Sequence, residues 1–190
     1  MKLWTAQETG FYDDLMANGI AYCTKVSEIA KDNGYAYEWM AEQMKKRIGL
    51  PPLPDIKLPV WAWYQYSSKK KRKPLKSKYE NSYDTLCVLI ELEVPDDQVL
   101  LSDFSLWNIP LNAGHILKDK KLRRKIDAYY PCEFSDFPAD LQKVIKDSWE
   151  VIFDLRNRDR DLNPKAMSNK SIQATLWSVR KEWLVSVEDY

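Results

Sequence analysis

One apolar segment near the middle of the chain, Leu86–Ile90, restricts most strongly what this sequence can fold into. All of its residues are apolar, and the residues after it alternate between Glu and Leu or Val until Pro95. A short apolar run with β-branched residues, closed by a proline, predicts a strand. Its first half is expected to be buried on both faces and its second half on one face. We therefore expect the rest of the chain to pack around this strand.

The residues that follow predict a turn, a second strand and a helix. Pro95–Asp97 has turn chemistry, because proline presets φ and aspartate tolerates a tight backbone. Gln98–Leu101 is expected to be a second short strand. Ser102 or Asp103 is placed to cap a short helix directly after it.

Other segments with strand or helix patterns are distributed in blocks along the chain, which favours an α+β fold. We expect one domain over residues 1–190, with a mainly antiparallel core sheet flanked by amphipathic helices. The strands near residues 60, 88 and 174 should share this sheet. The further predicted strands are Lys2–Ala6 as an edge strand, Val60–Tyr66, Ser171–Val179 and Trp183–Val187, and the predicted helices are one ending at Gly19, Thr24–Asn33, Tyr37–Ile48, Lys118–Tyr130 and Asp136–Leu155.

Composition and charge narrow the class of protein. Aromatic residues make up 13% of the 190 residues, which excludes a disordered chain, and the net charge of +1 gives no global field for nucleic acid or membrane. The three cysteines, Cys23, Cys87 and Cys132, are odd in number and far apart, which predicts reduced thiols. We find no signal peptide and no membrane-spanning run, so a cytoplasmic protein without a membrane partner is expected.

The only strongly biased segment is Ser67–Lys78, which holds seven positive charges and no acid. We expect a mobile loop at about 67–78. The basic residues in the middle of this loop could contact an anionic partner such as nucleic acid or a nucleotide, or the loop could stay solvated. The candidate anion-binding residues are Lys69, Lys70, Lys71, Arg72 and Lys73.

Candidate catalytic side chains outside this loop are few. His115 is the only histidine, which excludes a site with two histidine ligands, and we interpret it as a surface residue. Glu91 and Glu93 are two residues apart and should share one face of their strand. The solvent-facing side of a sheet explains this pair more simply than a metal or acid–base site does, so no metal site is predicted.

Five strings in order along nearly the whole chain resemble a family of bacterial and phage proteins described as domain of unknown function 3841. The family name implies no function. The strings are Leu3–Gln7, Glu38–Met44, Pro59–Gln65, Val94–Phe104 and Ile172–Trp177.

The layout is also distantly similar to small ADP-ribosyltransferase-like folds. That resemblance implies catalytic positions at Thr5, Tyr64 and Gln173, and implies NAD as a substrate and not as a tightly bound cofactor. Thr5 stands where those enzymes have a histidine, and Gln173 where they have a glutamate. An amide can form hydrogen bonds but carries no negative charge, so whether the chain is an enzyme stays open. The positions implied around the nucleotide are Trp4, Gln7, Gln65 and Thr175.

Three functional hypotheses follow. Polar residues such as Thr5 and Gln173 interrupt apolar strands and could converge on one nucleotide-binding cleft, or they could face solvent. The chain could instead be a nucleic-acid-binding module that uses the basic loop. The third hypothesis is a protein-interaction module without enzymatic activity.

Overall fold

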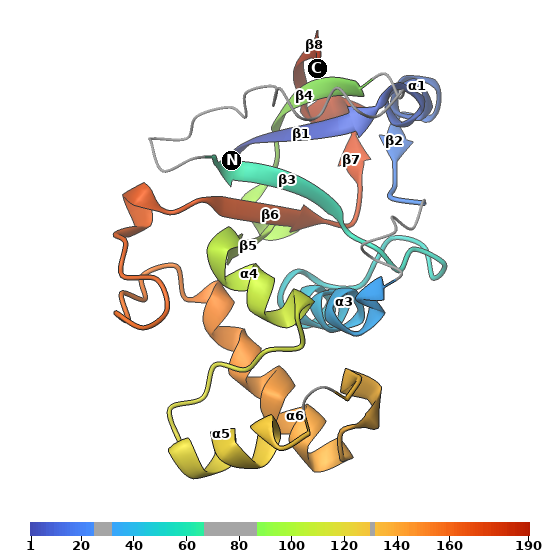
Figure 1. Cartoon of the computed structure of the whole chain (residues 1–190). Helices are drawn as coiled ribbons and strands as arrows, with labels where there is room; N and C mark the ends of the chain where they lie inside the picture. The colour runs from blue at the N-terminus through green and yellow to red at the C-terminus, as the bar shows by residue number, and fades with distance from the viewer. Residues whose placement is uncertain (25–31, 67–86, 130–131) are drawn as a thin grey trace.

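The computed structural model of the chain describes residues 1–24, 32–66, 87–129 and 132–190. Its centre is a six-stranded antiparallel sheet in the order β5-β6-β3-β1-β4-β8 (Figure 1). The predicted α+β class with an antiparallel core sheet is therefore confirmed. The strands are β1 (Lys2–Glu8), β3 (Val60–Gln65), β4 (Cys87–Glu93), β5 (Leu100–Asp103), β6 (Ile172–Leu176) and β8 (Leu184–Asp189), and β2 (Ile20–Ala21) pairs separately with β7 (Val179–Arg180).

The helices gather on one side of the β5 edge and at the end of β1 (Figure 1). None of the described helices is long and apolar enough to cross a membrane. The α-helices are α1 (Thr9–Asn18), α3 (Gly34–Ile48), α4 (Phe104–Leu111), α5 (Lys120–Asp127) and α6 (Ala139–Ser148), and short 3-10 turns cover Asp96–Gln98, Phe134–Asp136, Trp149–Phe153, Met167–Asn169 and Lys181–Trp183.

The segment that restricts the fold became β4, which lies between β1 and β8. Ile90 and Leu92 are fully buried, whereas Glu93 is exposed, as the change from an apolar run to alternation predicted. The prediction that the strands near residues 60, 88 and 174 share one sheet is confirmed, because β3, β4 and β6 belong to it. The prediction of an edge strand at Lys2–Ala6 is wrong. β1 pairs with both β3 and β4, and its three residues Leu3–Thr5 are all buried.

Two apolar clusters cover the two faces of the sheet. One cluster packs strand residues such as Leu3 and Ile90 against Leu15 of α1. The other lies beneath the helices and centres on Trp149, whose side chain is fully buried. Its ring lies 5.4 Å from that of Trp39, edge to face, the geometry that aromatic pairs favour. This pair joins α3 to the 3-10 turn after α6, so aromatic packing holds the helical layer together.

One predicted helix is shorter than expected, and another cannot be compared. The pattern predicted one helix over Asp136–Leu155, but α6 covers Ala139–Ser148 and continues as a 3-10 turn. Pro138 precedes the first turn, and the hydroxyl of Ser148 donates to the Ile145 carbonyl at 2.7 Å, where the chain tightens. The predicted helix Thr24–Asn33 lies mostly outside the described residues.

Candidate functional site

The cross-strand register places one row of predicted site residues on a single face of the sheet. Trp4 lies opposite Trp63, Trp63 opposite Gln173, and Gln173 opposite Ser102. Directly opposite residues project to the same face of a sheet. Thr175 is two residues from Gln173 and shares that face. Trp4, Gln173 and Thr175 are thus brought together on what we call the tryptophan face.

At its Trp4 end, the row of cross-strand neighbours continues to the carboxylate of Glu91. Glu91 lies opposite Trp4 and accepts a hydrogen bond from the Trp4 indole Nε1 at 3.0 Å. Its other oxygen lies 2.6 Å from the Lys2 ammonium. The hydrogen bond and the negative charge of Glu91 raise the pKa of Lys2 above its usual value. Glu91 therefore has structural partners rather than the solvent-facing role that the alternation indicated.

Thr5 and Gln7 project to the opposite face from the tryptophan face, because they alternate with Trp4 along β1. The Thr5 hydroxyl is buried, donates to the Trp61 carbonyl at 2.7 Å and accepts from the Gln7 amide at 2.7 Å. Tyr64 packs against the apolar cluster on that same opposite side. The hypothesis that Thr5 and Gln173 converge on one cleft is therefore wrong, because the sheet itself separates them.

Gln65, the predicted nucleotide-contacting amide of β3, is buried and already engaged. Its Nε2 donates to the carbonyl oxygens of Met167 at 2.9 Å and Lys170 at 2.5 Å. A bulge in the pairing with β6 follows Trp63 and turns Gln65 toward these groups. The role of Gln65 is to fasten the chain before β6 to the end of β3.

The tryptophan face contains buried polar atoms whose hydrogen bonding is incomplete. The atoms are Trp61 Nε1, Ser102 Oγ and Gln173 Oε1, and none has a partner in the part of the chain that the structure describes. A buried polar group left unpaired costs about 1–3 kcal/mol. Trp63 lies in the same row, is half-buried, and contacts Phe104 edge to face at 5.0 Å. Trp63 can offer a planar ligand a stacking surface, next to polar atoms that are buried in this structure.

Tyr37 closes the deeper end of this aromatic region. Its ring lies edge-on to Trp61 at 6.0 Å and to Trp107 at 5.8 Å. Burial raises the pKa of the Tyr37 hydroxyl, with a smaller contribution from Cys23. Tyr37 therefore stays neutral at ordinary pH and acts as a packing residue.

A second candidate site is built on α5. Asp119 caps this helix by accepting hydrogen bonds from the Lys121 and Leu122 amides at 2.7 and 3.1 Å. Fully buried Ile126 anchors its apolar stripe in the helical cluster. Five further positions of α5 carry cations that are exposed to solvent, namely Lys120, Lys121, Arg123, Arg124 and Lys125.

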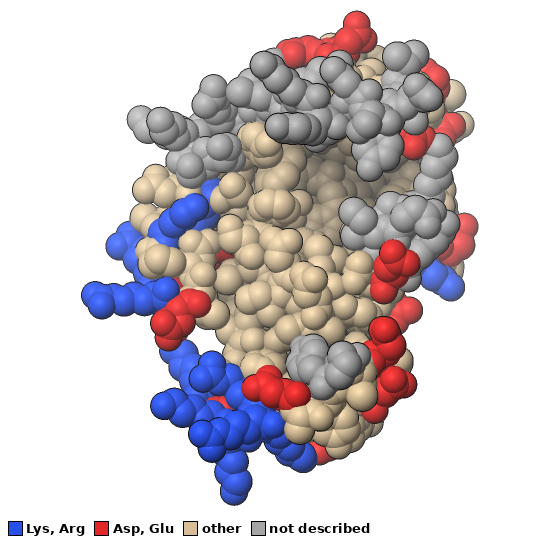
Figure 2. Space-filling view, in the orientation of Figure 1, with Lys and Arg blue, Asp and Glu red and all other residues tan. Residues whose placement is uncertain are grey.

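The segment before β6 adds cations beside those of α5. Figure 2 shows one group of Lys and Arg side chains at the lower left, where α5 lies, and a second group higher on the left, where this segment lies, with Asp and Glu side chains between them. The Lys118 ammonium, just before α5, lies 2.9 Å from a carboxylate oxygen of Asp159 in the segment. That hydrogen bond with Lys118 is the main reason the pKa of Asp159 lies below its usual value. We call the combined area the basic surface: Lys118, the five α5 cations, Arg156, Arg158, Arg160 and Lys165, all exposed.

A fully buried ion pair fixes this segment to the sheet. The Lys170 ammonium lies 3.0 Å from Oδ2 of Asp103, and both side chains have no exposed area. Lys170 also donates to the Asn157 carbonyl at 2.8 Å. The Asn163 amide donates to both oxygens of Asp103, at 3.1 and 2.8 Å. Asp103 in turn caps α4 through the Ser105 amide at 3.0 Å, which confirms its predicted capping role.

A hollow of about 300 Å³ opens where α5 faces the preceding loop. It is lined by His115 of the loop and by Lys120, Arg123, Arg124 and Asp127 of α5. Nε2 of His115 lies 3.3 Å from Oδ1 of Asp127, and the side chain is 13% exposed. The interpretation of His115 as a surface histidine without a partner is therefore wrong: it is mostly buried and paired with a carboxylate.

Several predicted features could not be placed in either site. The candidate anion-binding residues Lys69, Lys70, Lys71, Arg72 and Lys73 lie outside the described residues.

The basic surface was not identified as a binding site from the sequence. Lys120–Lys125 is a basic run in the sequence, but its pattern was interpreted only as a charged helix. None of the three cysteines forms a disulfide, and no cluster of His, Cys, Asp or Glu in the described ranges could hold a metal ion.

In a comparison with protein families, one family model matches the residues of nearly the whole sheet and of both candidate sites. The model of the family described as Domain of unknown function (DUF3841) matches residues 2–185. The chain belongs to the DUF3841 family. No curated protein and no solved structure matches this DUF3841 chain. The resemblance found from its sequence strings is thus confirmed, whereas nothing among these comparisons supports the ADP-ribosyltransferase-like resemblance.

Proposed function

We propose that this DUF3841 protein binds nucleic acid through the phosphate groups of the backbone, using the basic surface. One observation carries the proposal: two cation-rich segments lie on the same side of the molecule (Figure 2) and are joined by the Lys118–Asp159 contact. Residues 118–127 hold six cations and two carboxylates, and residues 156–165 hold four cations and two carboxylates. Together they contribute +6 to a chain whose net charge is only +1.

The basic surface is supported as a binding surface by the contacts that position its segments. The buried Lys170–Asp103 pair fixes the segment before β6 to the sheet, and the Lys118–Asp159 contact joins it to the chain just before α5. A preorganised surface loses less conformational entropy when a partner binds. Arg side chains also suit phosphate, because their planar donors can engage two oxygens at once. Five of the ten cations of the surface are arginines.

Salt-dependent binding tests this proposal directly. Labelled RNA, single-stranded DNA and duplex DNA of one sequence would be titrated by fluorescence anisotropy at several salt concentrations. Wild-type affinity should fall as salt rises, because phosphate contacts release counterions. The variant carries Arg123→Gln, Arg124→Gln, Arg158→Gln and Arg160→Gln. Its slope of log affinity against log salt should be shallower by about 0.7 to 0.9 for each phosphate that the variant no longer neutralises.

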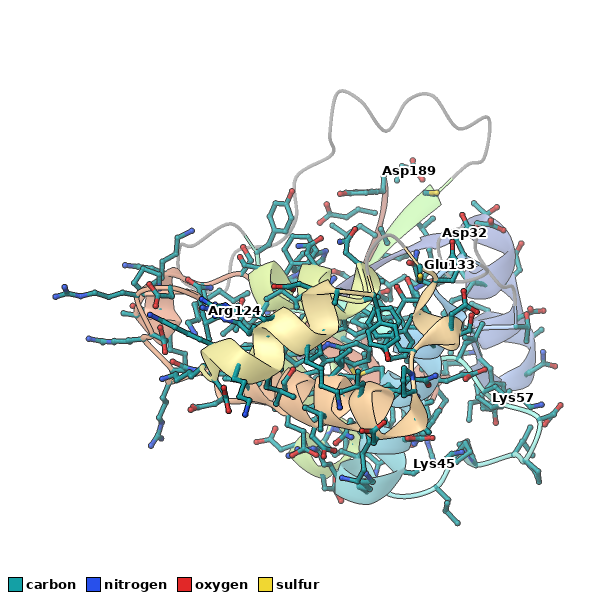
Figure 3. All side chains as sticks on the ribbon, turned by 60° about the horizontal axis from the view of Figure 1, so that its bottom comes forward. Asp32, Lys45, Lys57, Arg124, Glu133 and Asp189 are labelled. Atoms are coloured by element: carbon teal, nitrogen blue, oxygen red, sulfur yellow. The ribbon has the colours of Figure 1, made fainter. Side chains whose placement is uncertain are left out.

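Two control variants make the test specific. Lys45→Gln with Lys57→Gln removes exposed cations on the other side of the molecule from Arg124 (Figure 3), and should leave binding unchanged. Replacing Lys69–Lys73 with alanine separates the basic surface from the basic run of residues 67–78. If only the Lys69–Lys73 alanine variant loses binding, or if no nucleic acid binds at low salt, the basic surface is not the binding site.

A second candidate function is nucleotide binding on the tryptophan face. It is favoured by Gln173 Oε1 and Ser102 Oγ, which have no hydrogen-bond partner among the described residues and lie beside half-buried Trp63. NAD and ADP-ribose contain planar rings with donors and acceptors that could satisfy these atoms. In a thermal-shift assay, a bound nucleotide should raise the melting temperature by mass action. Gln173→Ala should abolish that shift, while Thr5→Ser, on the opposite face, should retain it. A shift that survives Gln173→Ala would exclude this face.

A further inference from the structure

The hollow between His115 and α5 is more selective than the rest of the basic surface. Lys120, Arg123, Arg124 and Asp127 follow the helical spacing of three and four residues, so they form one stripe along α5. This stripe faces the loop that carries His115. Lys121 lies outside the stripe and does not line the hollow. The hollow is therefore a built feature of two elements and differs from the outer cations of the same helix.

The loop that carries His115 is fixed by contacts with the helical cluster. The indole of fully buried Trp149 donates to the Gly114 carbonyl at 2.6 Å. The Ile116 amide donates to the Ser148 hydroxyl at 3.0 Å. A side chain on Gly114 would meet the Ile109 side chain at 3.0 Å, so this turn accepts only glycine without displacement. Both walls of the hollow are thus in place before any ligand arrives.

The charges around the hollow match a dianion. Lys120, Arg123 and Arg124 contribute three positive charges and Asp127 one negative charge, which leaves +2. A phosphomonoester carries about −1.5 to −2 at neutral pH, whereas a phosphodiester inside a nucleic-acid strand carries a single charge. Asp127 also holds Nε2 of His115 at 3.3 Å, and His115 Nδ1 is buried without a partner in the described residues.

The size of the hollow favours the end of a strand over its middle. A volume of about 300 Å³ is at the lower limit for small-molecule sites. It can hold one phosphate with part of its sugar, but it cannot hold several linked nucleotides. We infer that this hollow binds a terminal phosphomonoester, so that the protein recognises phosphorylated ends of nucleic acid. The end-recognition part of this inference rests on the proposed nucleic-acid-binding function.

Oligonucleotides that differ only at their ends test the inference. Strands of one sequence with a 5′-phosphate, a 3′-phosphate or only hydroxyl ends would be compared by anisotropy with the full chain. We expect roughly tenfold tighter binding for one phosphorylated end, about the factor that one charge-assisted hydrogen bond supplies. Comparison of the 5′ and 3′ arms identifies which end is recognised. Equal affinity for all three strands would overturn the inference.

Matched variants of α5 separate end recognition from general phosphate binding. Arg124→Gln and Lys120→Gln should each abolish the preference for phosphorylated ends. Lys121→Gln, on the same helix but outside the hollow, should weaken all three strands by a similar factor and keep their ratio. A preference that persists in both Arg124→Gln and Lys120→Gln would place end recognition elsewhere.

Inorganic phosphate provides a test that does not depend on nucleic acid. His115 is the only histidine, so its ring gives unique NMR signals. Phosphate should shift these signals in the wild type and not in Arg124→Gln. If phosphate shifts them but no oligonucleotide binds, the hollow is an anion site and the nucleic-acid proposal fails. If oligonucleotides bind without an end preference and phosphate has no effect, only the inference about the hollow fails.

Discussion

Replacement of Lys170 with methionine tests the buried ion pair that joins the segment before β6 to the sheet. The ammonium of Lys170 lies 3.0 Å from the Asp103 carboxylate, and neither side chain is exposed. Methionine approximates the apolar stem of lysine but removes the charge, so Asp103 would stay buried without its cation. Breaking such a pair on one side costs about 3–5 kcal/mol. That loss is a large fraction of the roughly 5–15 kcal/mol that stabilises a domain.

The hydrogen bonds that Asp103 keeps in the variant place the expected loss of unfolding free energy toward the lower end of about 3–5 kcal/mol. In Lys170→Met the carboxylate still accepts from both the Asn163 amide and the amides that begin α4. We therefore expect a loss of about 3 kcal/mol. In thermal unfolding this corresponds to a decrease in Tm of about 2–4 °C for each kcal/mol in a chain of this size. Urea unfolding followed by circular dichroism measures the free energy itself.

The double variant Asp103→Asn with Lys170→Met separates charge from shape. It removes both charges and keeps a side chain that can cap α4. Because no unpaired charge is left, it should recover much of the stability that Lys170→Met loses. A single variant that loses less than about 1 kcal/mol would refute the reasoning, since a buried unpaired carboxylate cannot be that inexpensive. A double variant no more stable than the single one would also contradict it.

Three further predictions concern the elements around the two sites. Trp149→Phe leaves the Gly114 carbonyl without its donor and should cost about 1–3 kcal/mol in urea unfolding, with wild-type-like stability as the contrary result. Gly19→Ala places a side chain at φ 75° in the left-handed region and should cost about 1–2 kcal/mol in the same assay; a smaller effect would mean that the helix end relaxes. Lys118→Gln should raise the pKa of Asp159, which carbon NMR titration can follow. Because that pKa is depressed in the fold, the stability it contributes is present above the usual value of 3.8 and is lost as pH falls through the folded pKa. An unchanged titration would contradict the assigned cause.

The features that the sequence predicted well depend on local physics. The run before Glu91 specified β4, and Asp103 was recognisable as a helix cap because capping involves residues only two or three positions away. The helical spacing of Trp149 in the segment Asp136–Leu155 indicates a core position, and Trp149 is fully buried. Gln173 and Thr175 share a face because alternation within one strand is fixed.

The errors arose where partners come from distant parts of the chain. Lys2–Ala6 was predicted to be an edge strand, but β1 lies between β3 and β4, and these neighbours are determined by long-range packing. Thr5 was assigned to the face of Gln173 because strand alternation does not give the register between strands, and a shift of one residue exchanges the faces. The charged and polar run Arg156–Lys170 predicts a loop, but its last residue, Lys170, is fully buried. Its burial depends on Asp103, which no local pattern connects to it.

The strand order also has a consequence for how the chain is assembled during synthesis. β1 pairs with both β3 and β4, and all three leave the ribosome before β5, but β5 is attached to the sheet only through β6. Until β6 emerges, β5 cannot pair with the sheet, and α4 cannot take its position next to β5. The aromatic residues that follow α4 then keep their apolar surfaces exposed. A nascent chain that stalls before β6 would therefore present the β1–β3–β4 nucleus with an unattached helical half. Such a chain exposes apolar surface until β6 and the Lys170–Asp103 contact are in place.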